Sequence, residues 1–341
     1  MPTIKDIAKI TGLSVSTVSV VLRGDTGRFG IRPETERKVR QAADRIGYMR
    51  NDFARTMVKG KSRVLGFIAR AGINPEYSGR LLCGAQLGAS EREYAIRFFL
   101  YDKSGEETLI PTLLSSRIGG VLISGDLGRT LTDRICRLCR AAGILCATVN
   151  LSNRVDGVGV VSDDEGGMAE MVCALHRMGH RRIYMFRTAS TAEFARTRLA
   201  GYRRGMRACG LRGASVLLKT GDEVLPPLET LIRRGYTAAV CDTDYTAARL
   251  MQQAYERGIR IPEEISLCGF AGVQVADFAA APLTTVAQDF EGMGRRAATE
   301  LIRRLERGEG KARKSHIENI RVSARLRIQK TTKERRSLDH A

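Results

Sequence analysis

The sequence predicts an α/β protein in which a small helical domain precedes a larger core of parallel sheets covered by helices. Three observations carry this prediction. The 341 residues exceed what one hydrophobic core holds and fit two or three domains. From Arg63 onward, short apolar segments alternate with helical stretches, which is typical of parallel sheets with helices on both faces. Before Arg63 the apolar residues instead follow the spacing of short helices.

The stretch from Thr3 to Leu22 has the pattern of two short helices around a tight turn. Thr3 is placed to cap the first helix, and the Asp6 carboxylate faces the positive helix end three residues later. Gly12 ends this helix, and Ser14 is placed to cap the second one. A helix-turn-helix of this kind puts the N-terminal part of its second helix into the DNA major groove. An ordinary helical hairpin is the alternative for such a short motif.

The second helix has one side that is free to touch something outside the domain. On a helical projection Val18, Val21 and Leu22 fall on the inner side. The candidate DNA-contacting residues of the two helices are Thr3, Ser14, Val15, Ser16, Thr17, Ser19 and Val20. Pro33 then opens a third helix that Gly47 ends, after a polar loop from Arg23 to Arg32. We therefore expect a three-helix DNA-binding domain at residues 1–49.

The positive charge of the chain lies at its two ends. Residues 1–63 contain 14 Lys and Arg against 6 Asp and Glu, and residues 303–341 contain 13 against 5. The basic N-terminal module suits a phosphate backbone, because neutralising phosphates releases counterions. We interpret the basic C-terminus as a solvated face followed by a frayed basic tail at residues 331–341.

Several other classes of protein are disfavoured. No apolar segment approaches the length that spans a bilayer, and the chain starts with a capped helix where a signal peptide would lie, so we expect a cytoplasmic protein. The eight cysteines suit reduced, buried thiols, and Cys136 and Cys139 form an isolated C-x-x-C without metal-site companions. His176 and His180 fit a helix end better than a metal pair. Since no nucleophile elbow or phosphate loop is present, we expect no enzyme, no cofactor and no metal.

Ten segments beyond Arg63 have the apolar pattern of strands. They are RVLGFIAR (63–70), YAIRFFLYD (94–102), GGVLISGD (119–126), GILCATVN (143–150), VGVVSD (158–163), RRIYMFR (181–187), SVLLK (215–219), TAAVCDTD (237–244), ISLCGF (265–270) and TTVAQD (284–289). In parallel sheets, ligands bind where the carboxyl ends of strands face a crevice.

The chain resembles the lactose-repressor (LacI/GalR) family of bacterial transcription regulators. Residues 3–22 fit the family signature T-I-x-D-[IV]-A-x-x-[AT]-G-[VL]-S-x-x-T-V-S-x-V-L throughout. Further similar segments are VVSDDEGG (160–167), RTRLAGYRRGM (196–206), IPEEISLCGF (261–270) and APLTTVAQDFEGMGRRAATELI (281–302). The similarity extends from Thr3 to about Gln329, nearly the whole chain.

The resemblance implies a hinge helix or linker at residues 50–62. In related proteins such a helix forms when two subunits lie side by side on DNA, and it pushes an apolar side chain into the minor groove. By this resemblance Met57 is the wedge, Ala54 packs on the partner's hinge, and Asn51 and Arg55 lie near the DNA backbone. Arg50 stands where the family usually has Pro. A disordered charged linker is the alternative for the free protein.

The resemblance also implies a periplasmic-binding-protein-like core at residues 63–330 that binds an effector between two lobes. We expect lobe one at about 63–160 and 290–330, and lobe two at about 161–289. The effector-contacting positions carried over from the family are Tyr77, Asp163, Arg198, Asp244, Phe270 and Gln288. Caps, ion pairs and lobe packing are the alternative roles of these residues.

Two departures from the family bear on its ligands. The family usually has Asp-Asp where this chain has Ala271-Gly272, so a carboxylate that often anchors the effector is absent. Because Arg187 and Arg196 add positive charge, an acidic or phosphorylated sugar-like effector is one hypothesis. Val20 stands where related repressors usually carry an Arg that reaches guanine, so we predict that this protein has lost one guanine requirement in each half-site.

The sequence thus predicts a homodimeric repressor that binds a pseudo-palindromic double-stranded DNA operator and responds to a carbohydrate-like small molecule. It predicts no contact with a membrane. Two alternatives remain: a constitutive DNA-binding regulator with a degenerate effector pocket, and a solute-binding protein with the same core.

Overall fold

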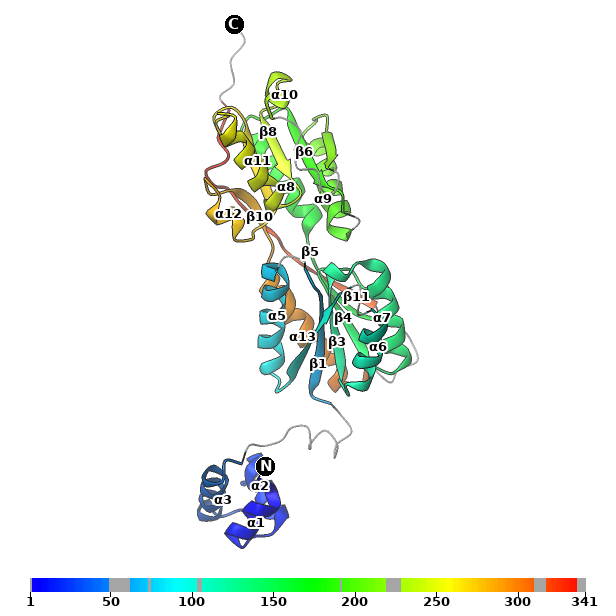
Figure 1. The fold of residues 1–341 in the computed structure, drawn as a ribbon, viewed down its shortest axis with the longest axis vertical. Coiled ribbons are helices and arrows are strands. Elements are labelled where there is room, and N and C mark those ends of the chain that lie inside the picture. The colour runs from blue at the N-terminus through cyan, green and yellow to red at the C-terminus, as the bar shows by residue number, and fades with distance from the viewer. Residues whose placement is uncertain are drawn as a thin grey trace. The chain divides into compact units, whose positions relative to one another are not determined.

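The computed structural model describes residues 2–48, 62–72, 75–102, 106–190, 192–218, 228–309 and 317–335. The chain divides into two compact units, Met1–Lys61 and Ser62–Ala341. Figure 1 shows that the first unit is helical and that the second consists of two α/β lobes. The predicted α/β class, with three N-terminal helices before two lobes of mainly parallel sheet, is confirmed.

The N-terminal unit contains α1 (Ile4–Thr11), α2 (Val15–Arg23) and α3 (Pro33–Arg45). The predicted caps are confirmed: Thr3 and Asp6 form a capping box at α1, and Ser14 accepts a hydrogen bond from the Thr17 N–H at α2. Gly12 ends α1 in the left-handed conformation (φ 69°) that favours glycine. The three helices bury one shared apolar core of Ile7, Ala8, Val18, Val21, Val39, Ala42 and Ala43.

Lobe one is built on a six-stranded parallel sheet in the order β11-β5-β4-β3-β1-β2. Its strands are β1 (Val64–Arg70), β2 (Ala95–Tyr101), β3 (Gly120–Ser124), β4 (Leu145–Val149), β5 (Gly157–Ser162) and β11 (Ile317–Val322). Its helices are α5 (Pro75–Ser90), α6 (Glu106–Ser115), α7 (Arg129–Ala141) and α13 (Phe290–Glu306), with the short 3₁₀ helix η1 (Gly125–Leu127) after β3. Separate apolar clusters, one with α5 and α13 and one with α6 and α7, cover the two faces of the sheet.

Lobe two is built on a second six-stranded sheet in the order β12-β10-β9-β8-β6-β7, in which only the β10–β12 pair is antiparallel. Its strands are β6 (Ile183–Thr188), β7 (Ala214–Leu218), β8 (Ala238–Cys241), β9 (Ser266–Ala271), β10 (Thr284–Ala287) and β12 (Arg325–Arg327). Its helices are α8 (Asp164–Arg177), α9 (Glu193–Ala208), α10 (Leu228–Arg233), α11 (Asp244–Glu256) and α12 (Val275–Phe278). All ten strands predicted from the sequence are confirmed.

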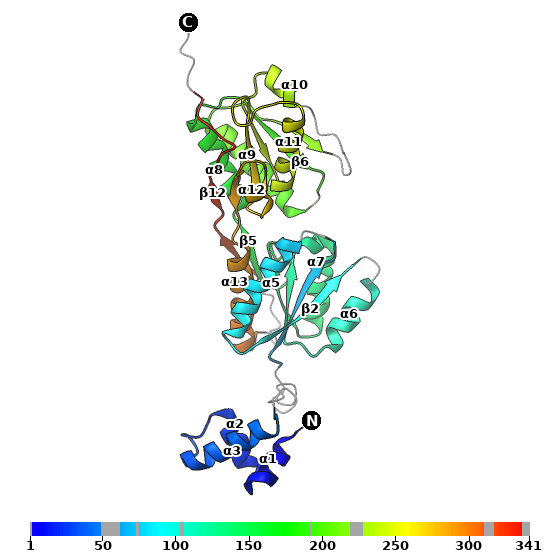
Figure 2. The ribbon, with the colours of Figure 1, turned by 60° about the vertical axis from the view of Figure 1, so that its left-hand side comes forward.

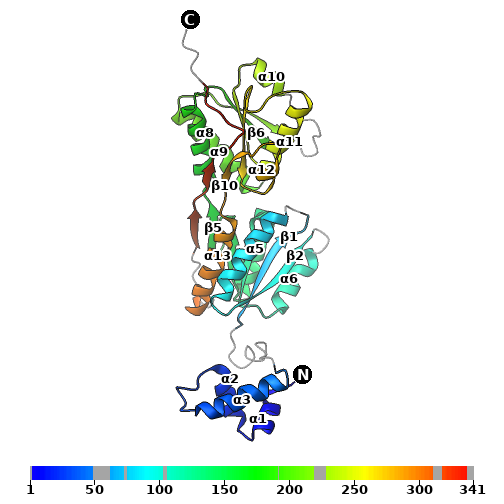
Figure 3. The same cartoon turned by 90° about the vertical axis from the view of Figure 1, so that its left-hand side faces the viewer.

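Three segments cross between the lobes: β5 to α8, β10 to α13, and β11 to β12 (Figure 3). The third crossing corrects the expected division of the chain. We expected residues 290–330 to belong to lobe one, but β12 pairs antiparallel with β10 in the sheet of lobe two. The described part of the chain therefore ends in lobe two, and β11 and β12 are edge strands that the sequence pattern did not indicate.

The segment at 331–335 also differs from the expected free tail. Thr331 is fully buried and is joined to Leu267 by two hydrogen bonds, Leu267 N to Thr331 O (2.8 Å) and Thr331 Oγ1 to Leu267 O (2.7 Å). The Arg335 N–H donates to the Met178 carbonyl at 2.7 Å. Because these backbone bonds continue the contact that β12 makes with lobe two, the basic segment is anchored to the lobe as far as Arg335.

The structure bears on the expected burial of the cysteines and on the expectations about a metal site and a membrane-spanning helix. All eight cysteines are free. Cys136, Cys139, Cys146, Cys241 and Cys268 are buried as expected, whereas Cys83 is exposed and Cys173 and Cys209 are half-buried. In the part of the chain that the structure describes, no group of three or more His, Cys, Asp and Glu side chains could hold a metal ion. Within the same residues, no helix combines the length and the apolar character that crossing a bilayer requires.

Candidate functional site

The N-terminal half of α2 presents small side chains to solvent. Val15 is 46% exposed, and Ser14 and Ser16 are exposed as well. The Ser14 hydroxyl caps the helix and lies 2.7 Å from the Ser16 hydroxyl and 2.8 Å from the Thr17 hydroxyl. Thr17 and Ser19 are half-buried, and Thr3 is exposed at the start of α1. The exposed end of α2 is thus narrow and polar, with one protruding valine.

Val20 was expected on this outer surface, but the structure buries it. Its side chain is only 8% exposed, and its carbonyl accepts hydrogen bonds from the N–H groups of Gly24 and Asp25, where the helix turns into the following loop. Val20 therefore belongs to the packed end of α2. The hinge positions Asn51, Ala54, Arg55 and Met57 lie outside the described residues.

Arg198 is the centre of a buried polar cluster in lobe two. Its side chain is 4% exposed, and its guanidinium donates to Asp164 Oδ2 (2.8 Å), the Asp242 carbonyl (2.6 Å) and Gln288 Oε1 (3.0 Å). Its carbon Cζ lies 4.0 Å from the ring centroid of Phe270. The structure thus brings together three of the predicted effector residues: Arg198, Phe270 and Gln288.

The carboxylate in this cluster is Asp164 and not Asp163. Asp164 Oδ1 accepts from Gln288 Nε2 at 2.7 Å, so Asp164 joins Arg198 to Gln288. Asp163 instead caps α8 by accepting from the Gly166 N–H, and it pairs with Arg321 at 3.0 Å. The capping role is the alternative that the sequence left open for Asp163.

Asp244 is also engaged by the protein. It is fully buried; Oδ1 accepts from the Thr285 hydroxyl at 2.5 Å and Oδ2 accepts from the Val273 N–H at 3.0 Å. Burial raises the pKa of this carboxyl. Asp244 therefore joins the start of β10 to the segment that follows β9, beside the Ala271-Gly272 departure. Ala271 holds a positive φ of 121°, which side-chain-bearing residues rarely adopt.

Tyr77 lies in lobe one, apart from the Arg198 cluster. Its ring meets that of Phe290 edge to face at 5.2 Å, on the contact between α5 and α13. Burial raises the pKa of its hydroxyl, and the charges of Asp126 and Asp164 add to the rise. Since Asp164 belongs to lobe two, its field acts on a residue of the opposite lobe.

Several buried polar atoms at the carboxyl ends of the strands have no hydrogen-bond partner among the described residues. They are Ser124 Oγ at the end of β3, Asp126 Oδ1 after β3, Ser162 Oγ at the end of β5, Arg187 Nε in β6 and Asp242 Oδ1 after β8. Burial raises the pKa of the carboxyl groups of Asp126 and Asp242. Buried polar groups in proteins are normally paired, so these unpartnered atoms are exceptions to that rule.

Asp126, Asp164 and Asp242 were missed from the sequence as candidate ligand contacts. Each follows a strand within two residues, so the rule that ligands lie at the carboxyl ends of parallel strands could have selected them. Arg196, considered as a source of positive charge, is exposed, whereas Arg187 is half-buried beside Asp242.

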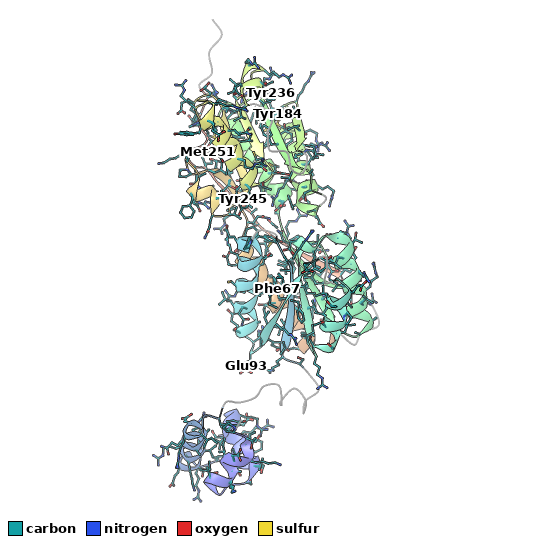
Figure 4. All side chains as sticks on the ribbon, in the orientation of Figure 1. Phe67, Glu93, Tyr184, Tyr236, Tyr245 and Met251 are labelled. Carbon is teal, nitrogen blue, oxygen red and sulfur yellow. The ribbon has the colours of Figure 1, made fainter. Side chains whose placement is uncertain are left out.

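Hydrogen bonds join the two lobes on both sides of these strand ends. On one side Arg129 and Ser152 of lobe one contact Glu193 of lobe two, with the Ser152 hydroxyl 2.8 Å from Glu193 Oε1. On the other side Arg80 donates to the Gly272 carbonyl at 3.3 Å. Tyr245 stands at the end of lobe two that faces lobe one (Figure 4). The polar strand ends of the two lobes therefore face a shared boundary.

Comparison with known proteins finds two similarities. Residues 3–51 match the bacterial regulatory proteins of the lacI family, and residues 172–332 match a periplasmic binding protein-like domain. The head of the chain therefore resembles the lacI family, and most of lobe two resembles periplasmic binding proteins. The chain is 26% identical over 317 residues to the HTH-type transcriptional repressor PurR of Vibrio atlanticus (strain LGP32), which covers 90% of this chain and 92% of that protein.

Solved structures of lacI-family regulators share the fold. The lac repressor dimer bound to operator and the anti-inducer ONPF superposes with a TM-score of 0.78 at 21% identity, over 97% of this chain and 99% of that one. The complex of the transcriptional regulator CelR with cellobiose gives a TM-score of 0.68 at 22% identity, over 97% and 100% of the two chains. The relatives named here are transcriptional repressors or regulators, and their solved structures share the fold of this chain.

Proposed function

We propose that the protein is a homodimeric repressor whose affinity for a pseudo-palindromic operator is set by a carbohydrate-like effector bound between its two lobes. The single observation that carries this proposal is the row of unpartnered buried polar atoms at facing strand ends, in a chain with a helix-turn-helix head. A rigid scaffold without a ligand would have those atoms paired. The relatives named above bind operator, ONPF or cellobiose, which fits the same arrangement.

The proposed DNA-reading surface is the exposed end of α2. Val15 offers an apolar contact that suits a thymine methyl, and the Ser16 hydroxyl can donate to or accept from a base edge. Thr3, Ser14, Thr17 and Ser19 remain proposed contacts to the backbone or to neighbouring bases. The hinge residues of 50–62 remain proposed contacts in the minor groove. Such a protein would act where the DNA is, in the bacterial cytoplasm.

The side chains at the strand ends favour a ligand that donates hydrogen bonds. Asp126 and Asp242 each have one carboxyl oxygen without a hydrogen-bond partner, Oδ1 in both. When this oxygen carries no proton, it can accept a hydrogen bond from a hydroxyl group of the ligand. Arg198 is already matched by Asp164, which leaves Arg187 as the cation with an unpartnered Nε. The unpartnered atoms thus include more hydrogen-bond acceptors than cationic donors. We therefore propose a neutral polyhydroxylated effector in place of the acidic sugar-like effector considered from the sequence.

The proposed dimer face lies on lobe one. Phe98 and Leu100 of the edge strand β2 are 45% and 60% exposed, and Leu87 of α5 is 58% exposed. Alternation along β2 puts Phe98 and Leu100 on the face of the sheet that α5 covers (Figure 2). An edge strand with exposed apolar side chains is suited to burial by a second copy.

The test has three measurements on the full-length chain. Selection of duplexes from random DNA should return a two-fold-related site, sedimentation should give a dimer, and fluorescence anisotropy should show that some neutral sugars change operator affinity. An Asp126→Asn variant should lose the sugar response, whereas Glu256→Gln, on the exposed surface of α11, should keep it. Operator binding that no metabolite changes would instead support the constitutive regulator. No preference for any duplex would overturn the proposal.

A further inference from the structure

Helices α8 and α9 pack unusually closely in lobe two. A Cβ atom added at Gly201 would lie 2.4 Å from the carbonyl oxygen of Glu165, and one added at Gly205 would lie 2.9 Å from that of Ala169. Only glycine allows such an approach of one helix to the backbone of another. From the first contact to the second, both helices advance by four residues, so they run in the same direction (Figures 1 and 3).

The next step of four residues along both helices reaches a pair of thiols. It leads from Ala169 to Cys173 in α8 and from Gly205 to Cys209, the residue that ends α9. The two sulfur atoms lie 3.4 Å apart, and both side chains are half-buried. A disulfide bond is about 2.05 Å long, so small side-chain rotations would bring the sulfurs to bonding distance.

No other pair among the eight cysteines combines proximity with access. Cys136, Cys139 and Cys146 neighbour one another but are buried in the core of lobe one. Cys83 is exposed on α5 and lies in the other lobe from Cys173 and Cys209. The Cys173–Cys209 pair is therefore the place where a small oxidant would meet two thiols at once.

We propose that Cys173 and Cys209 form a reversible disulfide when the protein meets a low-molecular-weight disulfide. One protein thiolate attacks a sulfur of the small disulfide and forms a mixed disulfide, which releases one small thiolate. The second protein thiolate then attacks the mixed disulfide and releases the other small thiolate, which takes up a proton as the first did. The protein loses two electrons and two protons in total, and the small disulfide is reduced to two thiols.

The bond would fix the packing of the two helices that carry the buried ion pair of lobe two. Asp164 is the first residue of α8, and Arg198 lies in the N-terminal half of α9. A covalent link at Cys173–Cys209 would hold the far end of the same helix pair. The oxidised lobe should therefore resist unfolding and rearrangement more than the reduced lobe.

Thiol exchange at this pair should be slow near neutral pH. Burial raises the pKa of Cys209, and the neighbouring Cys173 raises it further, while the charges of Arg177 and Arg181 oppose the rise. Because the thiolate is the nucleophile, a protonated Cys209 reacts slowly. The pair would thus remain reduced in an ordinary reducing cytoplasm and respond to sustained oxidation.

The test treats the reduced full-length protein with oxidised glutathione at pH 8, alkylates the remaining thiols and maps tryptic peptides. The expected product joins peptide 155–177 to peptide 208–212, loses two alkylation sites and reverts with dithiothreitol. The midpoint of thermal unfolding should rise by roughly 5 °C in the oxidised form. A Cys83→Ser variant should give the same linked peptides, because Cys83 is not part of the pair.

Cys173→Ser and Cys209→Ser should each lack the linked peptides and carry one glutathione on the remaining cysteine. Separate glutathione adducts on Cys173 and Cys209 in the wild-type chain, or full alkylation of both, would overturn the proposal. The wild-type peptide map decides the question even if a serine variant folds poorly. The outcome is independent of operator and effector binding.

Discussion

Arg198 and Asp164 form a buried ion pair in which Arg198 Nε lies 2.8 Å from Asp164 Oδ2 and each side chain is 4% exposed. The pair joins α8 to α9 and is completed by the Gln288 side chain, which lies at the crossing from β10 to lobe one. Two positions that the family resemblance carried over as effector contacts, Arg198 and Gln288, therefore also hold lobe two together. A ligand that competes for Arg198 or Asp164 would change the contact between α8 and α9 in lobe two. It would also change the contact with Gln288, on the segment that crosses from β10 to α13.

We predict that Arg198→Ala destabilises the protein by about 3 kcal/mol or more, because it leaves Asp164 buried without its cation. Urea unfolding followed by circular dichroism measures this loss. Arg196→Ala on the same helix is the control, since Arg196 is exposed, and it should change the free energy of unfolding by less than about 0.5 kcal/mol. Equal effects of the two variants would mean that the buried pair does not contribute as described.

Close packing in lobe one gives a second prediction. A Cβ added at Gly84 of α5 would lie 2.0 Å from the Glu291 carbonyl oxygen of α13, whereas a Cβ at Gly79 of α5 meets nothing within 4 Å. Gly84→Ala should therefore destabilise by about 2 kcal/mol or more through overpacking. Gly79→Ala should stabilise by about 0.5 to 1 kcal/mol, because alanine is the better helix former. Unfolding midpoints that shift in the same direction for both variants would contradict this contrast.

Most of the fold could be predicted because ten strands, including the edge strands β2 and β7, are mainly apolar. The two strands that were missed, β11 and β12, lie at the opposite edges of the two sheets and are less apolar. In β11 the apolar residues of IENIRV are interrupted by charge and amide, and β12 has three residues, two of them arginine. An edge strand can form with apolar residues on fewer sides, so the composition of β11 and β12 resembles that of a loop. The pairing of β12 with β10 and the bonds of Thr331 and Arg335 show that the described part of the chain ends in lobe two.

The candidate site was predictable by residue type but not by the direction of each side chain. Family resemblance selected Arg198 and Gln288, which do meet. Asp163 and Asp164 are adjacent, and one caps α8 while the next points at Arg198. Helical phase decides between them, and a one-residue difference in where a helix starts is beyond what a sequence pattern resolves. The same holds at the end of α2, where Val20 is buried.

Two valines of α2 provide a test of the DNA-reading surface. Val15 is 46% exposed and Val20 is 8% exposed. We predict that Val15→Ala weakens binding to the selected operator by about fivefold, roughly 1 kcal/mol, with little change in the stability of the head. Val20→Ala should instead destabilise the head by about 1 to 2 kcal/mol and leave its sequence preference unchanged. Anisotropy titrations and thermal unfolding of both variants separate these effects, and the reverse pattern would mean that α2 faces DNA differently.

His180 provides a prediction about pH. Its ring is fully buried; Nδ1 lies 2.9 Å from the Thr237 hydroxyl and Nε2 lies 3.1 Å from the Lys333 carbonyl of the anchored C-terminal segment. Burial lowers the pKa of His180 to about 4 from an ordinary value near 6.5. The folded state therefore favours neutral histidine, and between pH 4 and 6.5 the unfolded chain binds the proton more readily.

The stabilisation from neutral His180 is complete above pH 6.5 and is lost as the pH falls toward 4, in total about 2 to 3 kcal/mol. Urea unfolding at a series of pH values should show this decline in the wild-type chain. His180→Asn should be less stable at pH 7 and should lose most of the decline in this pH window, since asparagine does not titrate. His176→Asn is the control, because His176 is half-buried on the same helix end, and it should keep the wild-type slope. An unchanged slope in His180→Asn would show that other groups cause the decline.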